Sequence, residues 1–346
     1  MPKFSLIIPC YNLAPWIRAC LDSVRAQDCP DWEAICVDDE SSDASGAILD
    51  EYAGKDARIK VIHQKNAGEG GARNTGLAQA AGQWVFFLDG DDVLAPGSLS
   101  VLSSLVKAHP AEKLFRFDYQ VFEDGQPWTP RQPDLTCRRK EISRAIPMRD
   151  FFTYVWQHLF HRSIVENRRF KRYKRGCDRV FIDDILLNAV GSFVETNAIL
   201  YGYRQRQTSV MHRPPSLQII RDEMDHRRDI VNMIEASPKH VAYAGNWWLE
   251  GYFTADVGAL AAGRPAAERR AIREHWQMCA REMRKAKGFS RRARWVFAVC
   301  TRFPSPFVWW LFCRAWPRIS PYRFCRRVAG RFVREVRKIA FERKQK

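Results

Sequence analysis

The sequence predicts an α/β protein in which a mostly parallel sheet is flanked by helices and followed by a helical, basic appendage. Short apolar runs alternate with helix-like segments over the first hundred residues, and this alternation is typical of parallel strands joined by helical crossovers. Polar and acidic residues follow several of these runs. The net charge is +17, but residues 264–346 hold 24 Lys and Arg against 5 Asp and Glu. The rest of the chain is therefore close to neutral.

The expected elements follow one another at short intervals. We expect strands at residues 4–8, 34–37, 59–62 and 85–88, with helices at 16–26, 44–52 and 70–80 between them. A helix at 98–108 and a strand at 114–122 come next, and Asp124-Gly125 marks a turn. Residues 127–150 are rich in Pro, Arg and polar residues, which predicts a loop or a lid. Residues 214–263 have a helical pattern.

Composition indicates a folded protein of the cytoplasm. Hydrophobic residues make up 46% of the chain and aromatic residues 12%, which excludes a disordered protein. The ten Cys residues include no Cys-x-x-Cys pair and no zinc spacing, so we expect them to be reduced. Met1-Pro2-Lys3 leads directly into a strand-like run, so we expect no secretory signal.

The run from Trp84 to Leu88 is apolar and is followed at once by Asp89, Asp91 and Asp92. A strand that ends in carboxylates delivers them to the edge where open α/β sheets bind ligands. Carboxylate oxygens are also the ligands that hard divalent cations prefer. The alternative is a turn, because Asp and Gly also end strands for local reasons.

Four short motifs occur in order along the first part of the chain. They are Ile7-Ile8-Pro9-Cys10-Tyr11-Asn12, Val37-Asp38-Asp39-Glu40-Ser41-Ser42-Asp43, Asn66-Ala67-Gly68 with Ala72-Arg73-Asn74-Thr75-Gly76-Leu77, and Phe87-Leu88-Asp89-Gly90-Asp91-Asp92. Their order and spacing resemble glycosyltransferase family 2 over about residues 3–212. The resemblance implies the Rossmann-like GT-A fold, a nucleotide-diphosphate sugar donor, a divalent cation and inversion at the anomeric carbon.

The resemblance also implies roles for residues of the donor site. Pro9 and Tyr11 would line the nucleoside pocket, Asp39 would hydrogen-bond the base with support from Asp38, and Arg73 would reach the phosphates. A tyrosine ring can pack on a base while a carboxylate accepts its N–H groups. Local alternatives remain: a turn with a packed ring at Tyr11, a cap of the following helix at the Asp pair, and a surface ion pair at Arg73.

The same resemblance implies that Asp91 occupies the family's metal-binding position, that Asp89 faces the ribose or the metal, and that Asp92 lies beside them. We therefore rank Asp91 first, Asp89 second and Asp92 third as ligands of Mg²⁺ or Mn²⁺. A cation that bridges the diphosphate offsets the charge that develops on it as the glycosidic bond breaks.

Asp183-Asp184 falls where the family usually has Glu-Asp, so the resemblance implies Asp184 as the general base. One carboxylate must take the proton of the acceptor hydroxyl as its oxygen attacks. The alternative is an acidic pair in a first helical turn, which favours the helix dipole. Farther on, Arg204, Arg206, Ser209 or His212 could steady the diphosphate, or this segment could be an ordinary edge strand.

Residues 289–346 interleave Arg and Lys with Trp, Phe and Val. Pro304 and Pro306 interrupt the apolar stretch, which is too short to span a bilayer. Apolar residues from Phe324 onward recur at helical spacing between Arg residues, so we expect a basic amphipathic helix on an anionic membrane surface. Packing on the catalytic domain and nucleic-acid contact are the alternatives. Arg291-Arg292-Ala293-Arg294-Trp295 imitates a signature of processive synthases but lies too far along the chain.

The leading hypothesis is a peripheral glycosyltransferase on the cytoplasmic face of a membrane. It would move one sugar, UDP-linked, to a glycan or lipid-linked acceptor, with no nucleic acid as partner. We expect a catalytic domain at 1–213, divided into a donor half at 1–110 and an acceptor half at 111–213, a helical extension at 214–288 and a membrane tail at 289–346. The alternatives are a nucleotidyltransferase, which would release pyrophosphate, and a non-catalytic membrane-binding protein.

Overall fold

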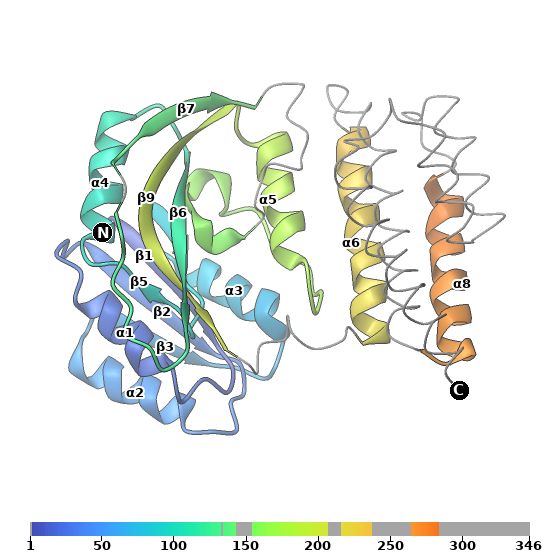
Figure 1. The fold of residues 1–346 in the computed structure, drawn as a ribbon, viewed down its shortest axis with the longest axis horizontal. Coiled ribbons are helices and arrows are strands. Elements are labelled where there is room, and N and C mark those ends of the chain that lie inside the picture. Colours follow the sequence, from blue (N-terminus) through green and yellow to red (C-terminus); the bar gives the residue numbers. More distant parts are fainter. Residues whose placement is uncertain (1, 133, 143–153, 207–215, 237–263, 284–346) are drawn as a thin grey trace, which may run out of the picture. The chain divides into compact units, whose positions relative to one another are not determined.

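A mixed sheet of nine strands is the centre of the first of two units, Met1–Arg213 and Pro214–Lys346 (Figure 1). The computed structural model describes residues 2–132, 134–142, 154–206, 216–236 and 264–283. In the sheet the strand order is β3-β2-β1-β4-β8-β6-β9-β5, and β7 pairs with β9.

The first four strands are parallel and form one half of the sheet. They are β1 (Phe4–Cys10), β2 (Trp32–Asp38), β3 (Ile59–His63) and β4 (Trp84–Phe87). The first three cover their expected strands, and β4 begins one residue before the expected 85–88 and ends one residue before its end. Because they run in the same direction, their carboxyl ends and the polar residues that follow lie along one edge.

The other half of the sheet is mixed. It contains β8 (His158–His161), β6 (Leu114–Glu123), β9 (Ser192–Gln205), β5 (Val93–Leu94) and β7 (Cys137–Glu141). Strand β7 lies inside the segment 127–150 that composition predicted to be a loop or lid. All five of its residues are exposed, and it pairs antiparallel with β9. An exposed strand needs no apolar residues, so hydrophobic periodicity could not reveal it.

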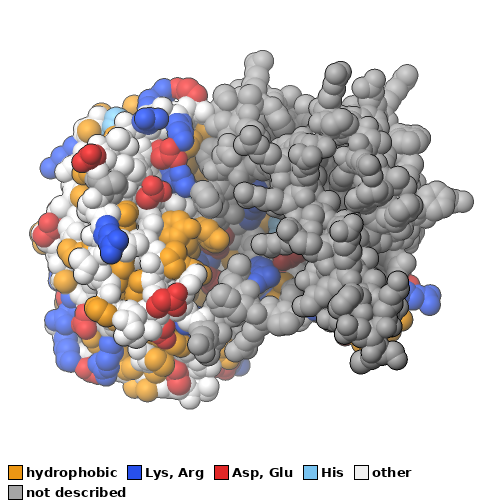
Figure 2. Space-filling view, in the orientation of Figure 1, with side chains coloured by type: hydrophobic (Ala, Val, Ile, Leu, Met, Phe, Trp, Pro, Cys, Tyr) orange, Lys and Arg blue, Asp and Glu red, His pale blue; other side chains and the backbone are white. Residues whose placement is uncertain are grey.

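Helices cover both faces of the parallel half (Figure 1). On one face lie α1 (Ile17–Arg25), α2 (Ser45–Lys55) and α4 (Ser98–Ala108), and on the other lie α3 (Gly68–Gln79) and α5 (Cys177–Asn188). Strand residues alternate between the two cores: Phe86 packs with the first group of helices, while Phe87 packs with the second. This arrangement confirms the predicted α/β fold class. On the face seen in Figure 2, acidic and basic side chains of the first unit are interspersed.

The second unit contains α6 (Leu217–Ala236) and α8 (Ala266–Met283), which pack against each other. His275 Nε2 lies 3.1 Å from Asp225 Oδ1 between them. Within the described part of the chain, no helix combines the length and apolarity needed to cross a bilayer. The tail at 289–346, with its expected amphipathic helix, lies outside the described residues.

One histidine is built into the core of the first unit. His158 is only 1% exposed, and its Nδ1 lies 2.9 Å from the carbonyl oxygen of Tyr154. Burial lowers the pKa of His158 to about 3, which outweighs the opposing effect of that hydrogen bond. The folded protein therefore keeps this imidazole neutral, whereas the unfolded chain protonates it below a pH of about 6.5.

We expect the folded protein to lose stability on mild acidification because unfolding takes up a proton at His158. Between pH 7.5 and 5.5 this one group should lower the free energy of unfolding by about 1.4 kcal/mol. Urea denaturation of the full chain at both pH values measures the loss, and His158→Gln should remove this part of it. The same pH dependence in both proteins would show that the imidazole is not held neutral.

Candidate active site

The loops that follow β1 and β2 are fastened to each other at the carboxyl edge. Asn12 and Glu40 both have positive φ angles, 53° and 66°, so the backbone turns sharply directly after each strand. The Asn12 side chain accepts a hydrogen bond from the backbone N–H of Ser42 at 2.8 Å, and the backbone N–H of Asn12 donates to Ser41 Oγ at 3.0 Å. The edge is therefore preorganised by local hydrogen bonds.

Asp38 and Asp39 lie at the end of β2 and are both buried. Asp38 accepts from the backbone N–H of Ser41 at 3.1 Å and contacts His63 Nδ1 at 2.9 Å. This hydrogen bond and a second one to Asp50 raise the pKa of His63. The cap-like contact with Ser41 belongs to Asp38, in line with the supporting role expected of it.

Asp39 joins the loop after β3. Its Oδ1 accepts from the backbone N–H of Ala67 at 2.8 Å and from Gln64 Nε2 at 2.7 Å. Tyr11 stands beside this group at the end of β1 with 52% of its surface exposed, while Pro9 is buried inside the strand. An exposed ring and a carboxylate with one engaged oxygen are therefore present at the expected nucleoside pocket.

A buried arginine forms the centre of the site. Arg73 of α3 is fully buried. Its Nη2 lies 2.7 Å from Asp89 Oδ1 and 2.5 Å from Glu69 Oε1, and its Nη1 lies 2.6 Å from Asp178 Oδ1. One guanidinium thus links the end of β4 to the first turn of α5. The burial of Arg73 excludes the surface ion pair, which was the alternative for this residue.

The charges in this group depend on one another. Burial alone would lower the pKa of Arg73, but its three carboxylate partners raise it well above the usual range. Burial raises the pKa of Asp89 to about 7 although Arg73 opposes this shift. The guanidinium therefore stays charged, and it is the group that permits carboxylates to collect in a poorly hydrated place.

The acidic loop after β4 is packed tightly against β1. A Cβ atom at Gly90 would come within 2.9 Å of Leu13 Cδ1 and 3.1 Å of the carbonyl oxygen of Pro9, so any larger residue between the two aspartates would force its neighbours to shift. Asp92 is 1% exposed, and its carboxylate accepts from Tyr201 Oη at 2.6 Å and from the backbone N–H of Arg204 at 2.7 Å. Both oxygens of Asp92 are thereby engaged by β9.

Asp91 is held differently from its neighbours. Its Oδ2 lies 2.7 Å from Arg206 Nη2, and the Arg206 guanidinium stacks 4.6 Å from the ring centre of Trp16. The partner of Asp91 is thus a cation on a partly exposed side chain, which a divalent ion could replace. Ser209 and His212, the other two candidates for steadying the diphosphate, lie outside the described residues.

The residues present fit a magnesium-type ion. Among the described residues, no group of three or more His, Cys, Asp or Glu side chains is arranged to hold a metal. Mg²⁺ is commonly bound by only one or two carboxylates, with water and substrate phosphates completing its shell. Asp91 and Asp89 together offer this number of ligands.

Asp183 and Asp184 lie farther along α5 than the charged cluster. Asp183 is fully buried, and burial raises its pKa to about 6 against the effect of Arg179. Asp184 lies 2.7 Å from Arg168 Nε and also accepts from Asn188. Asp178 precedes Asp184 by six residues, which is roughly 9 Å along a helix and about 120° around it. The structure thus brings Asp178, and neither of the predicted pair, into contact with Arg73.

Sequence reasoning overlooked Asp178 and Glu69. A signal for Asp178 was present: Gly176 precedes it, adopts a left-handed φ of 85° and starts α5 at Cys177, so Asp178 falls in the first turn. Glu69 lies four residues before Arg73, the spacing of an ion pair on one helical face.

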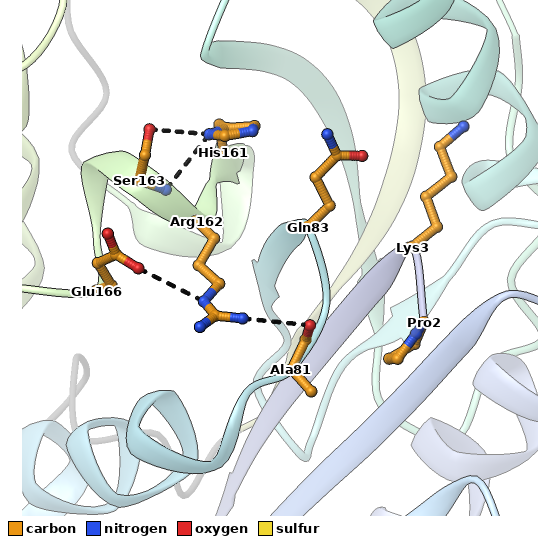
Figure 3. A pocket seen from close by; sticks show the side chains of 8 residues that line it. All are labelled: Pro2, Lys3, Ala81, Gln83, His161, Arg162, Ser163 and Glu166. Carbon is orange, nitrogen blue, oxygen red and sulfur yellow. Dashed lines mark hydrogen bonds and ion pairs between the residues drawn. The ribbon is translucent and has the colours of Figure 1, made fainter.

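A pocket of about 540 Å³ opens elsewhere on the first unit (Figure 3). It is lined by Pro2, Lys3, Ala81, Gln83, His161, Arg162, Ser163 and Glu166. Pro2 and Lys3 precede β1, and Gln83 precedes β4, so this pocket lies at the amino ends of the parallel strands. Open α/β sheets bind their ligands at the opposite edge, and the pocket does not belong to the candidate active site.

The fold agrees with that of known proteins. The chain is similar to the TarS 1-349 fragment of S. aureus, solved in complex with UDP-GlcNAc, with a TM-score of 0.69 and 20% identity over 87% of both chains. A mannosyltransferase from Pyrobaculum calidifontis, solved with GDP-Man and Mn²⁺, gives a TM-score of 0.50 at 16% identity over 88% of both chains. These likenesses and the sheet topology define a protein of the GT-A fold.

The sequence also matches a known protein family. Residues 5–169 match the family model described as Glycosyl transferase family 2. This match covers just under half of the chain and confirms the resemblance carried by its four motifs.

The chain is also similar to individual bacterial glycosyltransferases. The chain is 32% identical to the uncharacterized glycosyltransferase EpsJ of Bacillus subtilis over 229 residues, which cover 62% of this chain and 64% of EpsJ. It is also 32% identical to the GalNAc(5)-diNAcBac-PP-undecaprenol beta-1,3-glucosyltransferase of Campylobacter jejuni over 49% of this chain and 55% of that protein. The chain thus spans 64% of the length of EpsJ and 55% of the length of the C. jejuni protein.

We expect Arg73→Met to destabilise the first unit because it removes the buried cation that pairs with Glu69, Asp89 and Asp178, whose side chains are 53%, 21% and 19% exposed. Because these carboxylates keep contact with water, the loss in the free energy of unfolding should be smaller than the roughly 3–5 kcal/mol that is usual for a fully buried pair. Urea denaturation measures it. Arg18→Met is the matched control, since Arg18 pairs with Glu51 on the surface and its loss should change stability little. Equal stability of both variants would contradict a central role for Arg73.

Proposed function

We propose that the protein is an inverting glycosyltransferase that moves one sugar from a UDP-linked donor to a glycan or lipid-carried acceptor. The observation that carries this proposal is the ion-pair chain from Asp89 through Arg73 to Asp178 at the carboxyl edge of the sheet. It joins a donor-side carboxylate to an acceptor-side carboxylate. The family match and the UDP-GlcNAc complex of the TarS fragment support the proposed transfer from a UDP-sugar. The C. jejuni relative, named for an undecaprenol-linked acceptor, supports a role in cell-surface polysaccharide or lipopolysaccharide synthesis.

For the donor, we propose that Tyr11 packs on the uracil ring while Asp39 accepts a base N–H group. Tyr11 is the exposed aromatic residue at the end of β1, and the described hydrogen bonds of the Asp39 carboxylate all go to its Oδ1. Asp38 supports this arrangement by holding the turn at Ser41. Pro9 is buried inside β1, so it would support the floor of the pocket without contacting the nucleoside itself.

For the diphosphate, we propose that Asp91 and Asp89 hold Mg²⁺ or Mn²⁺. Such an ion would supply positive charge that offsets the charge developing on the departing nucleoside diphosphate. Asp92, which ranks third, keeps the loop in place through Tyr201 and Arg204. Arg206, once released from Asp91, is then available to a phosphate oxygen. Arg73 acts on the diphosphate only through Asp89, because it is itself fully buried.

For the acceptor, we propose Asp178 as the general base in place of the expected Asp184. Inversion proceeds by one displacement, in which the acceptor oxygen bonds to the anomeric carbon as the bond to the diphosphate breaks. The base takes the proton of the acceptor hydroxyl at the same time. Asp178 is preferred because it shares the Arg73 guanidinium with Asp89 at the carboxyl edge, although its side chain is only 19% exposed. Asp184 is 31% exposed but pairs with Arg168 and Asn188 instead, and Asp183 is fully buried.

Release of UDP tests the activity and the base together. The full chain, with Mn²⁺, a panel of UDP-sugars and a glycan and lipid extract as acceptor, should release UDP from at least one donor. Asp178→Asn should lower this rate by about 10²–10⁴-fold while Asp184→Asn stays within about threefold. Both variants should bind UDP as the parent protein does, measured by calorimetry.

Three other outcomes of this assay are informative. Release of pyrophosphate instead of UDP would identify a nucleotidyltransferase, and release of neither with any donor would refute the enzyme proposal. Loss of turnover in Asp184→Asn alone would return the role of base to Asp184.

We further propose that residues 1–213 form the catalytic domain, with a donor half at 1–110 and an acceptor half at 111–213, and that 214–288 extend it with helices. Residues 289–346 would bind the anionic cytoplasmic face of a membrane through their basic and aromatic side chains. The enzyme would then be peripheral and lie close to a lipid-linked acceptor.

Sedimentation with lipid vesicles tests the tail. The full chain should bind vesicles that contain phosphatidylglycerol, since each cation near an anionic surface contributes about 1 kcal/mol. Binding should weaken with added salt, and it should disappear when residues 289–346 are removed. Equal binding to neutral phosphatidylcholine vesicles would refute an electrostatic membrane contact. A lack of binding to either kind of vesicle would refute it as well.

A further inference from the structure

Beside the charged cluster, four aromatic residues form what we call the aromatic platform: Tyr119, Tyr154, Trp156 and Tyr203. Trp156, in the short helix η1 (Val155–Gln157), is at its centre. The rings of Tyr154 and Tyr203 stack on Trp156 with centroid distances of 4.9 and 5.5 Å and interplanar angles of 12° and 16°. Tyr119 meets Trp156 edge-on at 4.9 Å. Trp156 itself is only 3% exposed, so the part of the platform that a ligand can reach is formed by the three tyrosine rings packed around it, Tyr154 above all.

The hydroxyl groups of the platform have no hydrogen-bond partner within the described part of the chain. By contrast, the hydroxyl of the neighbouring Tyr201 is fully buried and donates to Asp92. Tyr154 is 39% exposed, and Tyr119 and Tyr203 are partly exposed. Polar groups in the interior normally find a partner in the protein, whereas these three hydroxyls remain available to a ligand.

The platform adjoins both halves of the candidate active site. Between Tyr154 and Trp156, the backbone N–H of Val155 donates to Asp178 Oδ2 at 3.3 Å. On its inner side, Trp156 stacks at 4.4 Å on Tyr201, which holds Asp92.

Electrostatics agrees with this location. Burial, followed by the nearby carboxylates of Asp92 and Asp91, raises the pKa of Tyr203 to about 12. The hydroxyl of Tyr203 therefore lies close to the carboxylates that we assign to the donor side.

We propose that the aromatic platform binds the acceptor, by stacking against the pyranose ring that carries the attacking hydroxyl. This inference rests on the proposed function, because it names the substrate class of the same site. The face of a pyranose ring presents C–H groups that pack on aromatic carbon, and its edge presents hydroxyls that can pair with tyrosine hydroxyls. No platform residue carries a charge at neutral pH, so the platform suits a neutral sugar rather than a phosphate or a carboxylate.

The position of the platform orients the bound sugar. A sugar stacked there would lie near Asp178, the proposed base, because the backbone N–H of Val155, between Tyr154 and Trp156, donates to Asp178 Oδ2. Rigid aromatic side chains bind with little loss of conformational entropy, which makes them suitable anchors for a weakly bound substrate. Stacking is tolerant of the sugar's identity, so the three hydroxyls supply the selection among sugars.

Ligand-observed NMR tests the platform without requiring turnover. Methyl glycosides of glucose, galactose, mannose and N-acetylglucosamine serve as probes, because they lack charge, an aromatic group and a lipid. At least one should bind the full chain. The triple variant Tyr119→Phe, Tyr154→Phe, Tyr203→Phe keeps the rings and should weaken that binding by about tenfold or more. Tyr52→Phe is the matched control, since it removes a tyrosine hydroxyl that bonds Asp22 instead.

UDP binding, measured by calorimetry on the same samples, should be unchanged in every variant. Tyr154→Ala adds a second comparison, because this ring is 39% exposed and stacks on Trp156 from outside, and it should weaken glycoside binding as well. Equal glycoside affinity in the parent protein and in all platform variants would overturn the inference, as would no binding of any probe.

The two proposals can fail separately. If UDP release persists while the platform variants bind glycosides normally, the transferase remains and the platform is refuted. If glycosides bind in a platform-dependent manner but no UDP is released from any donor, the sugar site is supported and the transfer activity is refuted.

Discussion

The need to neutralise one buried guanidinium organises this site. Arg73 has no exposed surface, and a charge so buried is tolerated only with well-placed partners of opposite sign. Its two Nη atoms collect carboxylates from three places: Glu69 on its own helix, Asp89 after β4 and Asp178 at the start of α5. Electrostatics therefore fixes the spacing of two carboxylates to which we assign different substrates. The same ion pairs that stabilise the fold thus prepare the chemistry.

Around this centre, the acidic loop is divided between fixed and exchangeable contacts. Gly90 allows the loop to approach β1, and Asp92 is fastened to Tyr201 and Arg204. Asp91, by contrast, is paired only with the partly exposed Arg206 in the described structure. At the proposed cation site, Asp92 holds the loop in place and Arg206 is the side chain that an ion would displace from Asp91. Such a site can accept an ion without rearrangement of the backbone.

The aromatic stack gives the same loop a second contact. Tyr201 joins Asp92 to Trp156, and the residue before Trp156 touches Asp178 through its backbone N–H. Donor-side and acceptor-side groups are therefore connected twice, once by ions through Arg73 and once by rings through Trp156. Because the two connections are separate, acceptor binding can depend on the aromatic stack while the nucleotide contacts stay in place.

Much of the fold and part of the site could be predicted from the sequence. The buried strands carry continuous apolar runs that end in polar residues, so β1 to β4 and their shared edge were accessible to pattern analysis. Strand β7 was not, because an exposed edge strand has no apolar pattern. Asp178 was missed because the start of α5 depends on the left-handed Gly176, whereas Asp183 and Asp184 stand out inside an apolar run. The burial of Arg73 depends on contacts between residues a hundred positions apart, which no local pattern contains.

A crystal structure of the full chain with UDP and Mn²⁺, with the ion located by its anomalous signal, tests the central claim most directly. We predict a manganese peak beside the carboxylate of Asp91, with Arg206 released from it and Arg73 still bridging Asp89 and Asp178. A peak away from this loop, or a bound state in which Arg73 no longer contacts Asp178, would contradict this claim.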